Sequence, residues 1–390
     1  MKIDYIMDNP TFGINYDFGK IIKEYNKLGI PEEFYSPVFA IRQGCKYNIG
    51  VSERSTGKTT DWLLLGMVMH KLYGTVTQYI RQSEDMITPK NIKSMMSVII
   101  QYGYIEKITS GKYNSCFYKA RNWYYCKVKD NEIIEKSGEA FCYCLDLDDS
   151  EVYKSSLNQP TGDLIIYDEF ISKRYYPNEF VIFCDIVKTI IRERHSPIVV
   201  MLANTTDRYN TYFQELGIQQ EILSIKVNEY FTKTTFGGTT IFCELIGNKN
   251  KERETQNSLF FGFKNPRLAS ITGGDWAIDN YPHIVSEDCK TLNKAHFIEY
   301  NNYIVQLEIC QNKRLGTFIK VHKANHIKEE NSIVYSIDGI KDKRYRHKFG
   351  YNAVDGMIFL LLKRNKWFYS TNEVGNVVSS YIAQAKKLIW

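Results

Sequence analysis

A Gly-Lys-Thr triplet stands at Gly57–Thr59, at the end of the stretch Gly50-Val-Ser-Glu-Arg-Ser-Thr56. Between a strand and a helix, such a triplet can bind a nucleoside triphosphate, because backbone N–H groups at the helix start hold phosphate oxygens and the helix dipole favours their charge. Lys58 would reach the β- and γ-phosphates, and the Thr59 hydroxyl would bind Mg²⁺. The predicted phosphate-binding residues are Ser52, Glu53, Arg54, Ser55, Thr56, Gly57, Lys58, Thr59 and Thr60.

The triplet departs from the usual Gly-x-x-x-x-Gly-Lys-[Ser/Thr] pattern at one position, because Ser52 stands where the first glycine belongs. Serine lacks the free access to positive φ that glycine has. Taken alone, the triplet also fits a strand-to-helix turn that binds nothing. Arg54 inside the loop is equally compatible with a phosphate contact, an ion pair across a subunit interface, and an exposed loop charge.

A second motif favours nucleotide binding over a turn that binds nothing. Leu164–Tyr167 is a continuous apolar run, typical of a strand buried on both faces of a parallel sheet, and it ends in Asp168-Glu169. Asp168 would bind Mg²⁺, and Glu169 would orient and activate the attacking water. The two motifs in this order predict a site that binds ATP with Mg²⁺ and hydrolyses it. A glutamate in the second position favours a motor-type ATPase over a kinase or a small GTPase.

Four further residues are candidates for the same site. Asn204 ends an apolar strand and is predicted to sense the γ-phosphate, with a helix cap or turn as the alternative. Arg192 and Arg194 follow an apolar helix, where arginine also suits the helix dipole without any further role. Arg81 ends another strand and could contact nucleotide or DNA. The candidates for catalysis are thus Glu169, Lys58, Arg192, Arg194 and Asn204, with Thr59 and Asp168 as metal ligands. On the residues alone, a solvated helix end is the simpler interpretation of the two arginines.

Composition sets broad limits. The chain has 390 residues, 44% of them hydrophobic, which is enough for two or three domains. Its net charge of +6 permits nucleic-acid binding without arguing for it strongly. No apolar stretch approaches the length of a membrane span, and the first residues lack the apolar region of a signal peptide, so we expect no membrane attachment. The nine cysteines and seven histidines show no metal-ligand spacing, which favours reduced thiols.

The pattern of elements predicts an α/β fold with a mostly parallel sheet at 1–225. Predicted strands at 47–51, 76–81, 164–167 and 198–203 alternate with predicted helices at 60–73, 89–102 and 180–192. Residues 104–147 are rich in Tyr, Phe, Lys and turn residues, which predicts inserted β-hairpins. Residues 226–285 carry two Gly-Gly pairs and a charged run, and they are predicted to be a linker or small lobe.

Residues 286–390 are predicted to form a separate α+β domain. Its strands are expected at 303–310, 315–321, 333–337 and 367–370, and its helices at 352–363 and from 374 onward. The basic run Lys341–Lys348 and the Lys and Tyr residues at 112–128 suit nucleic-acid contact, although such runs are more often solvated loops. Glu308, Asp338 and Asp355 could in principle hold the two metals of a nuclease, but their spacing is not distinctive.

These residues resemble one family, the DNA-packaging ATPases of phi-29-like tailed phages. Its arginine-containing phosphate loop is similar to Ser52–Thr59, and its second motif is similar to Tyr167–Ile171. Tyr176-Pro-Asn-Glu179 resembles the family's Pro-Asn-Glu segment, and Ile191-Arg-Glu-Arg194 its arginine-rich helix end. The resemblance continues at Val199–Asn204, Tyr212-Phe213, Tyr300–Tyr303 and Val334–Ile340. It runs at low identity from about residue 40 to the C-terminus.

The resemblance implies a P-loop ATPase domain of the ASCE type, followed by an RNase-H-like domain without working nuclease residues. It implies a homo-oligomeric ring, a pentamer by resemblance, that moves double-stranded DNA into a preformed capsid. Arg192 of one subunit would serve as an arginine finger in the next subunit's site. The implied partners are double-stranded DNA and the capsid portal, and the need for a packaging RNA stays open. The implied location is the host cytoplasm, with transient attachment to the procapsid and absence from the mature virion.

Three alternatives remain open at this point. The chain could be another P-loop DNA motor, such as a helicase or a DNA pump of the cellular type. It could be a terminase with an active nuclease domain. It could also be a nucleotide-gated interaction protein that does not hydrolyse ATP, in which case replacing Glu169 by glutamine would leave its behaviour unchanged.

Overall fold

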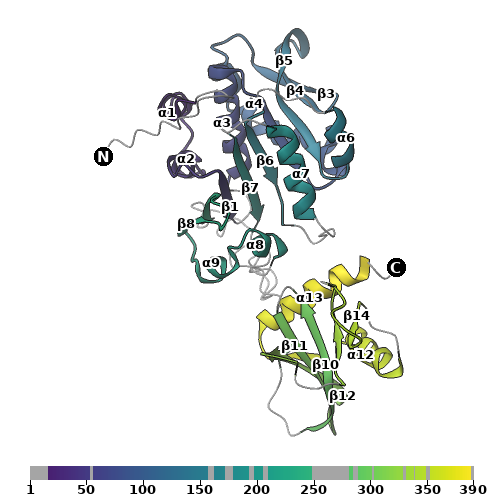
Figure 1. The fold of residues 1–390 in the computed structure, drawn as a ribbon. Coiled ribbons are helices and arrows are strands. Elements are labelled where there is room, and N and C mark those ends of the chain that lie inside the picture. The colour runs from purple at the N-terminus through teal and green to yellow at the C-terminus, as the bar shows by residue number, and fades with distance from the viewer. Residues whose placement is uncertain are drawn as a thin grey trace. The chain divides into compact units, whose positions relative to one another are not determined.

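The structure is a computed structural model that describes residues 16–52, 56–156, 162–171, 179–192, 197–204, 210–247, 281–283, 289–300, 303–327, 331–337, 339–347 and 352–387. These residues form two compact units (Figure 1). The first contains the described residues from 16 to 204 and from 216 to 247. The second contains 210–215 and the described residues from 281 onward.

The first unit is built on a nine-stranded sheet with the order β3-β4-β5-β2-β6-β7-β1-β9-β8. Its six central strands, from β5 to β9 in that order, are parallel, and antiparallel hairpins extend both edges. The strands are β1 (Tyr47–Ser52), β2 (Thr77–Arg81), β3 (Ser115–Lys119), β4 (Asn122–Lys129), β5 (Glu132–Asp146), β6 (Leu164–Asp168), β7 (Ile198–Asn204), β8 (Tyr230–Thr234) and β9 (Thr240–Ile246).

Helices cover both faces of this sheet (Figure 1). The alternation of side chains along β6 shows the two faces: Leu164 and Ile166 join the core of one face, while Tyr167 stacks on Phe183 of the other at 4.8 Å. The first face carries α1 (Phe18–Asn26), α2 (Val38–Arg42), α3 (Lys58–Tyr73), α4 (Pro89–Gln101) and α5 (Tyr104–Ile108), and the other carries α7 (Glu179–Ile191). The remaining helices of this unit are η1 (Glu84–Ile87), α6 (Ser150–Ser156) and α9 (Gln219–Ser224).

The helix α3 packs tightly against the sheet. Ten of its sixteen residues are buried, as expected for a helix covered on several sides. At Gly66 the helix approaches β2 so closely that a Cβ atom would lie 2.2 Å from the Thr77 hydroxyl oxygen. This contact fixes the start of α3 relative to the ends of the neighbouring strands.

The strands and helices expected between residues 47 and 204 are present, with boundaries shifted by at most two residues. The structure differs from the expected elements in two places. Residues 104–147 begin with the helix α5, and β5 joins the main sheet by pairing in parallel with β2. Residues 230–246, which were expected in a linker or small lobe, form β8 and β9, and β9 pairs in parallel with β1. The Gly237-Gly238 pair is the turn of this hairpin, with φ of +79° at Gly238.

The second unit is an α+β fold on a six-stranded sheet with the order β14-β13-β10-β11-β12-β15. Its strands are β10 (Lys290–Tyr300), β11 (Tyr303–Asn312), β12 (Gly316–Ala324), β13 (Ile333–Tyr335), β14 (Tyr345–Arg346) and β15 (Trp367–Tyr369). The helices α12 (Ala353–Lys363) and α13 (Asn372–Lys387) pack on one face of the sheet. A short helix, α8 (Thr211–Glu215), also belongs to this unit. The strand β10 was not expected, because its first half is exposed and polar.

The residues considered for a nuclease site do not converge where the structure describes them. Asp355 is fully buried and accepts a hydrogen bond from the Tyr335 hydroxyl at 2.6 Å, while Glu308 accepts one from Thr291 at 2.7 Å. Asp338 lies outside the described residues. Within the described ranges, no group of three or more His, Cys, Asp or Glu residues could hold a metal ion.

The basic run of the second unit is partly neutralised by its own neighbours. Lys341 forms an ion pair with Glu299, and the Arg344 guanidinium binds the Asp342 carboxylate at 2.7 Å. Lys348 lies outside the described residues. Across both units, no helix in the described part of the chain combines the length and apolar character needed to cross a membrane.

Candidate ATPase site

The loop between β1 and α3 is closed by a contact between its two ends. The Ser52 and Thr56 hydroxyl groups lie 3.0 Å apart, and Gly57 adopts a φ of +85° just before α3 begins at Lys58. Ser52 is the last residue of β1 and lies in an extended strand, where no glycine is required. The departure from the usual motif therefore carries no backbone strain at this position. Glu53, Arg54 and Ser55 lie outside the described residues.

Lys58 and Asn204 lie together at the edge of the sheet where the parallel strands end. Because β1 and β7 are neighbours with Ser52 opposite Asn204, the start of α3 faces the end of β7. The Lys58 ammonium donates a hydrogen bond to the Asn204 side-chain oxygen at 2.9 Å. The Lys58 side chain is buried, so its charge would act on a phosphate group through little water.

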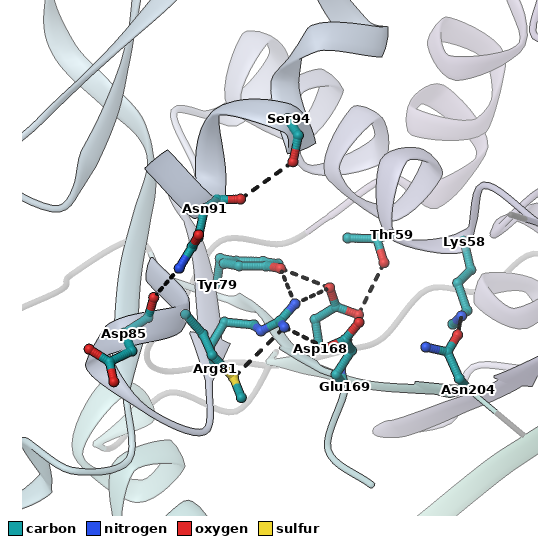
Figure 2. A network of polar contacts seen from close by, with 11 residues as sticks. Lys58, Thr59, Tyr79, Arg81, Asp85, Asn91, Ser94, Asp168, Glu169 and Asn204 are labelled. Atoms are coloured by element: carbon teal, nitrogen blue, oxygen red, sulfur yellow. Dashed lines mark hydrogen bonds and ion pairs between the residues drawn. The ribbon is translucent and has the colours of Figure 1, made fainter. Parts of the chain in front are cut away.

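The end of β6 brings Asp168 to the same edge, opposite the start of α3. The Thr59 hydroxyl donates to one oxygen of the Asp168 carboxylate at 3.0 Å (Figure 2). A hydroxyl and a carboxylate are hard oxygen donors of the kind that Mg²⁺ prefers, so this pair fits the predicted metal site. Thr60 lies beside Thr59 in the wall of the cavity described below.

Glu169 follows Asp168 in a strained backbone conformation. Its φ is +55°, in the left-handed region that residues other than glycine rarely adopt. Its side chain is 48% exposed, and it accepts a hydrogen bond from the Arg81 guanidinium at 2.5 Å. A strained residue of this kind often marks a functional position.

Two residues of β2 complete the contacts of the carboxylates. The Tyr79 hydroxyl and the Arg81 guanidinium donate to the second Asp168 oxygen at 2.8 and 3.2 Å (Figure 2). Burial, together with the Asp168 charge, raises the pKa of Tyr79 well above its usual value, so its hydroxyl stays protonated. The sequence allowed a contact of Arg81 with nucleotide or DNA, and the structure places its guanidinium on the two adjacent carboxylates. The role of Tyr79 had no signal in the sequence.

Glu179, the last residue of the Pro-Asn-Glu segment, is buried at the start of α7. Its carboxylate accepts hydrogen bonds from the Tyr167 hydroxyl at 3.0 Å and from the Gln82 amide at 2.7 Å. These contacts connect α7 to β6 and to the residue that follows β2. Glu179 therefore anchors the end of the sheet beside the site. Residues 172–178 lie outside the described residues.

Arg192 lies at the far end of α7. This helix returns the chain from the carboxyl end of β6 to the start of β7, so Arg192 lies near the opposite edge of the sheet from Lys58. It is exposed, with φ of +50°. The structure therefore does not bring Arg192 together with the other predicted catalytic residues of the same chain. Arg194 lies outside the described residues.

A cavity of about 530 Å³ opens between these residues, a suitable size for a nucleotide. Its polar wall contains Thr56, Gly57, Lys58, Thr59, Thr60, Asp168, Glu169 and Asn204. The structure thus gathers the described residues Thr56–Thr60, Asp168, Glu169 and Asn204 around one space, whereas Ser52 is fully buried and does not line it. Residues that the sequence did not indicate also line it, notably Phe34 from the N-terminal segment and Tyr102 after α4.

The fold is similar to that of two solved phage proteins. The first is the Phi-28 gp11 DNA packaging motor, with a TM-score of 0.54 at 17% identity over 91% of this chain and 99% of that one. The second is the bacteriophage Phi-29 viral genome packaging motor assembly, with a TM-score of 0.55 at 16% identity over 91% of this chain and 100% of that one. No protein-family model and no curated protein sequence matches the chain. At this identity the likeness shows a shared fold, a mostly parallel α/β sheet unit followed by a second sheet unit.

Proposed function

We propose that this protein is an ATPase that drives double-stranded DNA into a preformed viral capsid as a homo-oligomeric ring. One observation carries the proposal. At one edge of a parallel sheet, Lys58 and Thr59 at the start of α3 contact Asn204 and Asp168 at the ends of two strands. Glu169 stands beside them. This is the arrangement that ATP hydrolysis requires: groups for phosphates, metal and water at one place.

Each residue has a defined part in the proposed reaction. Thr59 and Asp168 would hold Mg²⁺, which supplies charge to the phosphate oxygens. Lys58 would neutralise the β- and γ-phosphates. The Glu169 carboxylate would accept a proton from the water that attacks the γ-phosphorus, and Asn204 would sense whether the γ-phosphate is present.

The arginine finger is assigned to a neighbouring subunit. Because Arg192 lies away from the phosphate loop of its own chain, we propose that it acts in the site of the next subunit of a ring. There its guanidinium would stabilise charge on the transferred phosphoryl group. Arg194, two residues later, is the alternative finger. Arg54 is proposed to contact phosphate from within the loop.

The DNA-packaging role is supported by the likeness in fold to two phage packaging motors over nine tenths of the chain. Following the family resemblance of the sequence, we also propose the capsid portal as a partner, with or without a packaging RNA, and a pentameric ring. The protein would act in the host cytoplasm, attached to the procapsid only during packaging. We propose the second unit, with residues 286–390, as the part that contacts nucleic acid or capsid.

The test is ATP hydrolysis measured against protein concentration, with and without duplex DNA. We expect a rate that rises more than linearly with concentration and increases with DNA. Glu169→Gln and Arg192→Ala should each be inactive alone. Mixing the two should restore activity, because an Arg192→Ala subunit keeps its own Glu169 and receives the arginine of a Glu169→Gln neighbour.

Three results would contradict the proposal in different ways. Hydrolysis that depends on Glu169 but is linear in concentration, with no rescue in the mixture, would exclude the shared site. Hydrolysis that never exceeds that of Glu169→Gln, even after empty capsids are added, would exclude the motor. Full stimulation by DNA with no effect of capsids would point to a different DNA motor instead.

A further inference from the structure

The nucleotide cavity has two ends of different chemistry. One end carries the charged and polar groups already described, from Lys58 to Glu169. The other end is lined by the apolar and aromatic side chains Ile30, Phe34, Leu64, Val98, Tyr102 and Tyr104, and the buried Asp61 carboxyl group lies near Phe34 and Gly57. A triphosphate chain would occupy the polar end and has no use for aromatic contacts. The second end therefore suits a different chemical group of the same ligand.

Two tyrosines form one wall of this aromatic end. The Tyr102 and Tyr104 rings are nearly parallel, with centroids 5.8 Å apart and planes at 13°. Gly103 between them has a φ of +66°, which turns the chain from α4 into α5 and allows both rings to lie on the same side. Tyr104 is buried and has the Lys107 ammonium 5.2 Å from its ring centroid, whereas Tyr102 is 50% exposed. One ring is thus an anchor and the other remains available to a ligand.

The opposite wall comes from the N-terminal segment. The Tyr35 amide donates a hydrogen bond to the Thr56 carbonyl oxygen at 3.0 Å, which ties this segment to the phosphate loop. The Phe34 ring lies so close to Gly57 that a Cβ atom there would be 3.2 Å from it. Phe34 is therefore positioned by the same loop that would hold the phosphates. A group bound between Phe34 and Tyr102 would stand at a fixed distance from the triphosphate.

We infer that this aromatic end binds the base of the nucleotide, with Tyr102 stacking on it and Phe34 closing the opposite side. The inference rests on the proposed function, because it requires the triphosphate to occupy the polar end. Flat heteroaromatic rings stack on tyrosine through their π-faces, and removing such a contact weakens binding by roughly 5- to 150-fold. The N-terminal segment thereby gains a role in binding, although it lies outside both sequence motifs.

The test compares two ligands that differ by the nucleoside. Calorimetry on the full chain with Mg²⁺ would measure the affinities of ATP and of inorganic tripolyphosphate, which lacks a base. We expect Tyr102→Ala to weaken ATP binding at least about fivefold, the lower limit for a lost stacking contact, and to change tripolyphosphate binding less than about twofold. Tyr102→Phe, which keeps the ring, should bind ATP nearly as well as the wild type. Phe236→Ala, which removes an exposed aromatic ring in the β8–β9 turn, is the matched control and should change neither.

Each other outcome would overturn the inference. Equal weakening of both ligands by Tyr102→Ala would mean that the ring supports the loop and does not bind the base. Unchanged ATP binding in that variant, or wild-type binding of tripolyphosphate as tight as that of ATP, would mean that no base contact exists there. Failure of the proposed function would give a different result. The wild type would then bind ATP and tripolyphosphate no more tightly than Lys58→Ala does, which would mean that the protein has no phosphate site.

Discussion

Replacing Glu169 by glycine is expected to abolish hydrolysis and yet give a more stable protein than replacing it by alanine. Glu169 has a φ of +55°, and a residue with a Cβ atom in this region costs about 1–2 kcal/mol relative to its usual conformations. Glycine avoids this strain but loses about 0.5–1 kcal/mol through the greater freedom of the unfolded chain. The glycine variant should therefore be more stable than the alanine variant by about 0.5–1 kcal/mol.

The lost ion pair does not affect this comparison. Both variants remove the contact with Arg81, and because Glu169 is 48% exposed, the contact contributes about 1 kcal/mol or less. Arg81 keeps Asp168 and Tyr79 as partners in either case. The difference in free energy of unfolding between the two variants thus reports the backbone conformation at position 169 alone.

Urea unfolding followed by tryptophan fluorescence would measure the difference, since Trp62 and Trp123 are both buried in the first unit. ATP hydrolysis should fall at least about 100-fold in both variants, as expected when a general base is lost. Glu169→Gln serves as a control that keeps the strained backbone and should be no more stable than the wild type. An alanine variant that is as stable as the glycine variant would refute the strain argument.

Two other perturbations test the packing and the charge of the site. Gly66→Ala should destabilise the protein by about 1–3 kcal/mol despite the better helix propensity of alanine, because the new methyl group would meet the Thr77 hydroxyl at 2.2 Å. Gly356→Ala in the first turn of α12, where an added Cβ atom would meet nothing outside its own helix backbone and chain neighbours within 4 Å, should instead stabilise the protein by about 0.5–1 kcal/mol. Equal effects of the two variants in urea unfolding would contradict the close approach at Gly66. Burial raises the pKa of Asp61 to about 8, so the folded protein keeps a proton that the unfolded chain releases above about pH 4. The stability of the protein should therefore fall as the pH rises from about 4 to about 8, and it should level off above about pH 8. Asp61→Asn should remove this dependence of stability on pH. If the melting temperatures of the variant and the wild type fall in parallel from about pH 5 to about pH 8, the assignment to Asp61 is wrong.

The central strands and the site around Lys58 could be predicted because local sequence determines them. The run Leu164–Tyr167 is apolar at every position, as a strand buried on both faces must be, and Gly57-Lys58 marks a strand-to-helix turn. The carboxyl ends of parallel strands meet at one edge, so placing Asp168 near Lys58 followed from the fold class alone.

The contact between Arg81 and the carboxylates could not be predicted in the same way. It depends on β2 lying beside β6 with Gln78 opposite Ile165, and no residue in either strand specifies that pairing. The pairing of β9 with β1 could not be predicted for the same reason, because the apolar run of β9 is compatible with any buried position in the sheet. Phe34 lines the cavity next to Tyr35, whose amide binds the Thr56 carbonyl oxygen. Such long-range placements depend on tertiary packing, for which one sequence offers no periodic signal.

The two adjacent carboxylates are held in different ways, and the difference matches the work proposed for them. Asp168 accepts hydrogen bonds from Thr59, Tyr79, Arg81 and the Glu169 backbone amide. These donors come from α3, from β2 and from its own turn, so the loss of one leaves the carboxylate in place, as a metal ligand requires. Glu169 is half exposed, and Arg81 is its one side-chain partner among the described residues. Its carboxylate can therefore leave that partner at small cost and turn to a water molecule, which a fixed group could not do. The strained backbone at Glu169 and the four donors that hold Asp168 thus support the proposed roles of base and metal ligand.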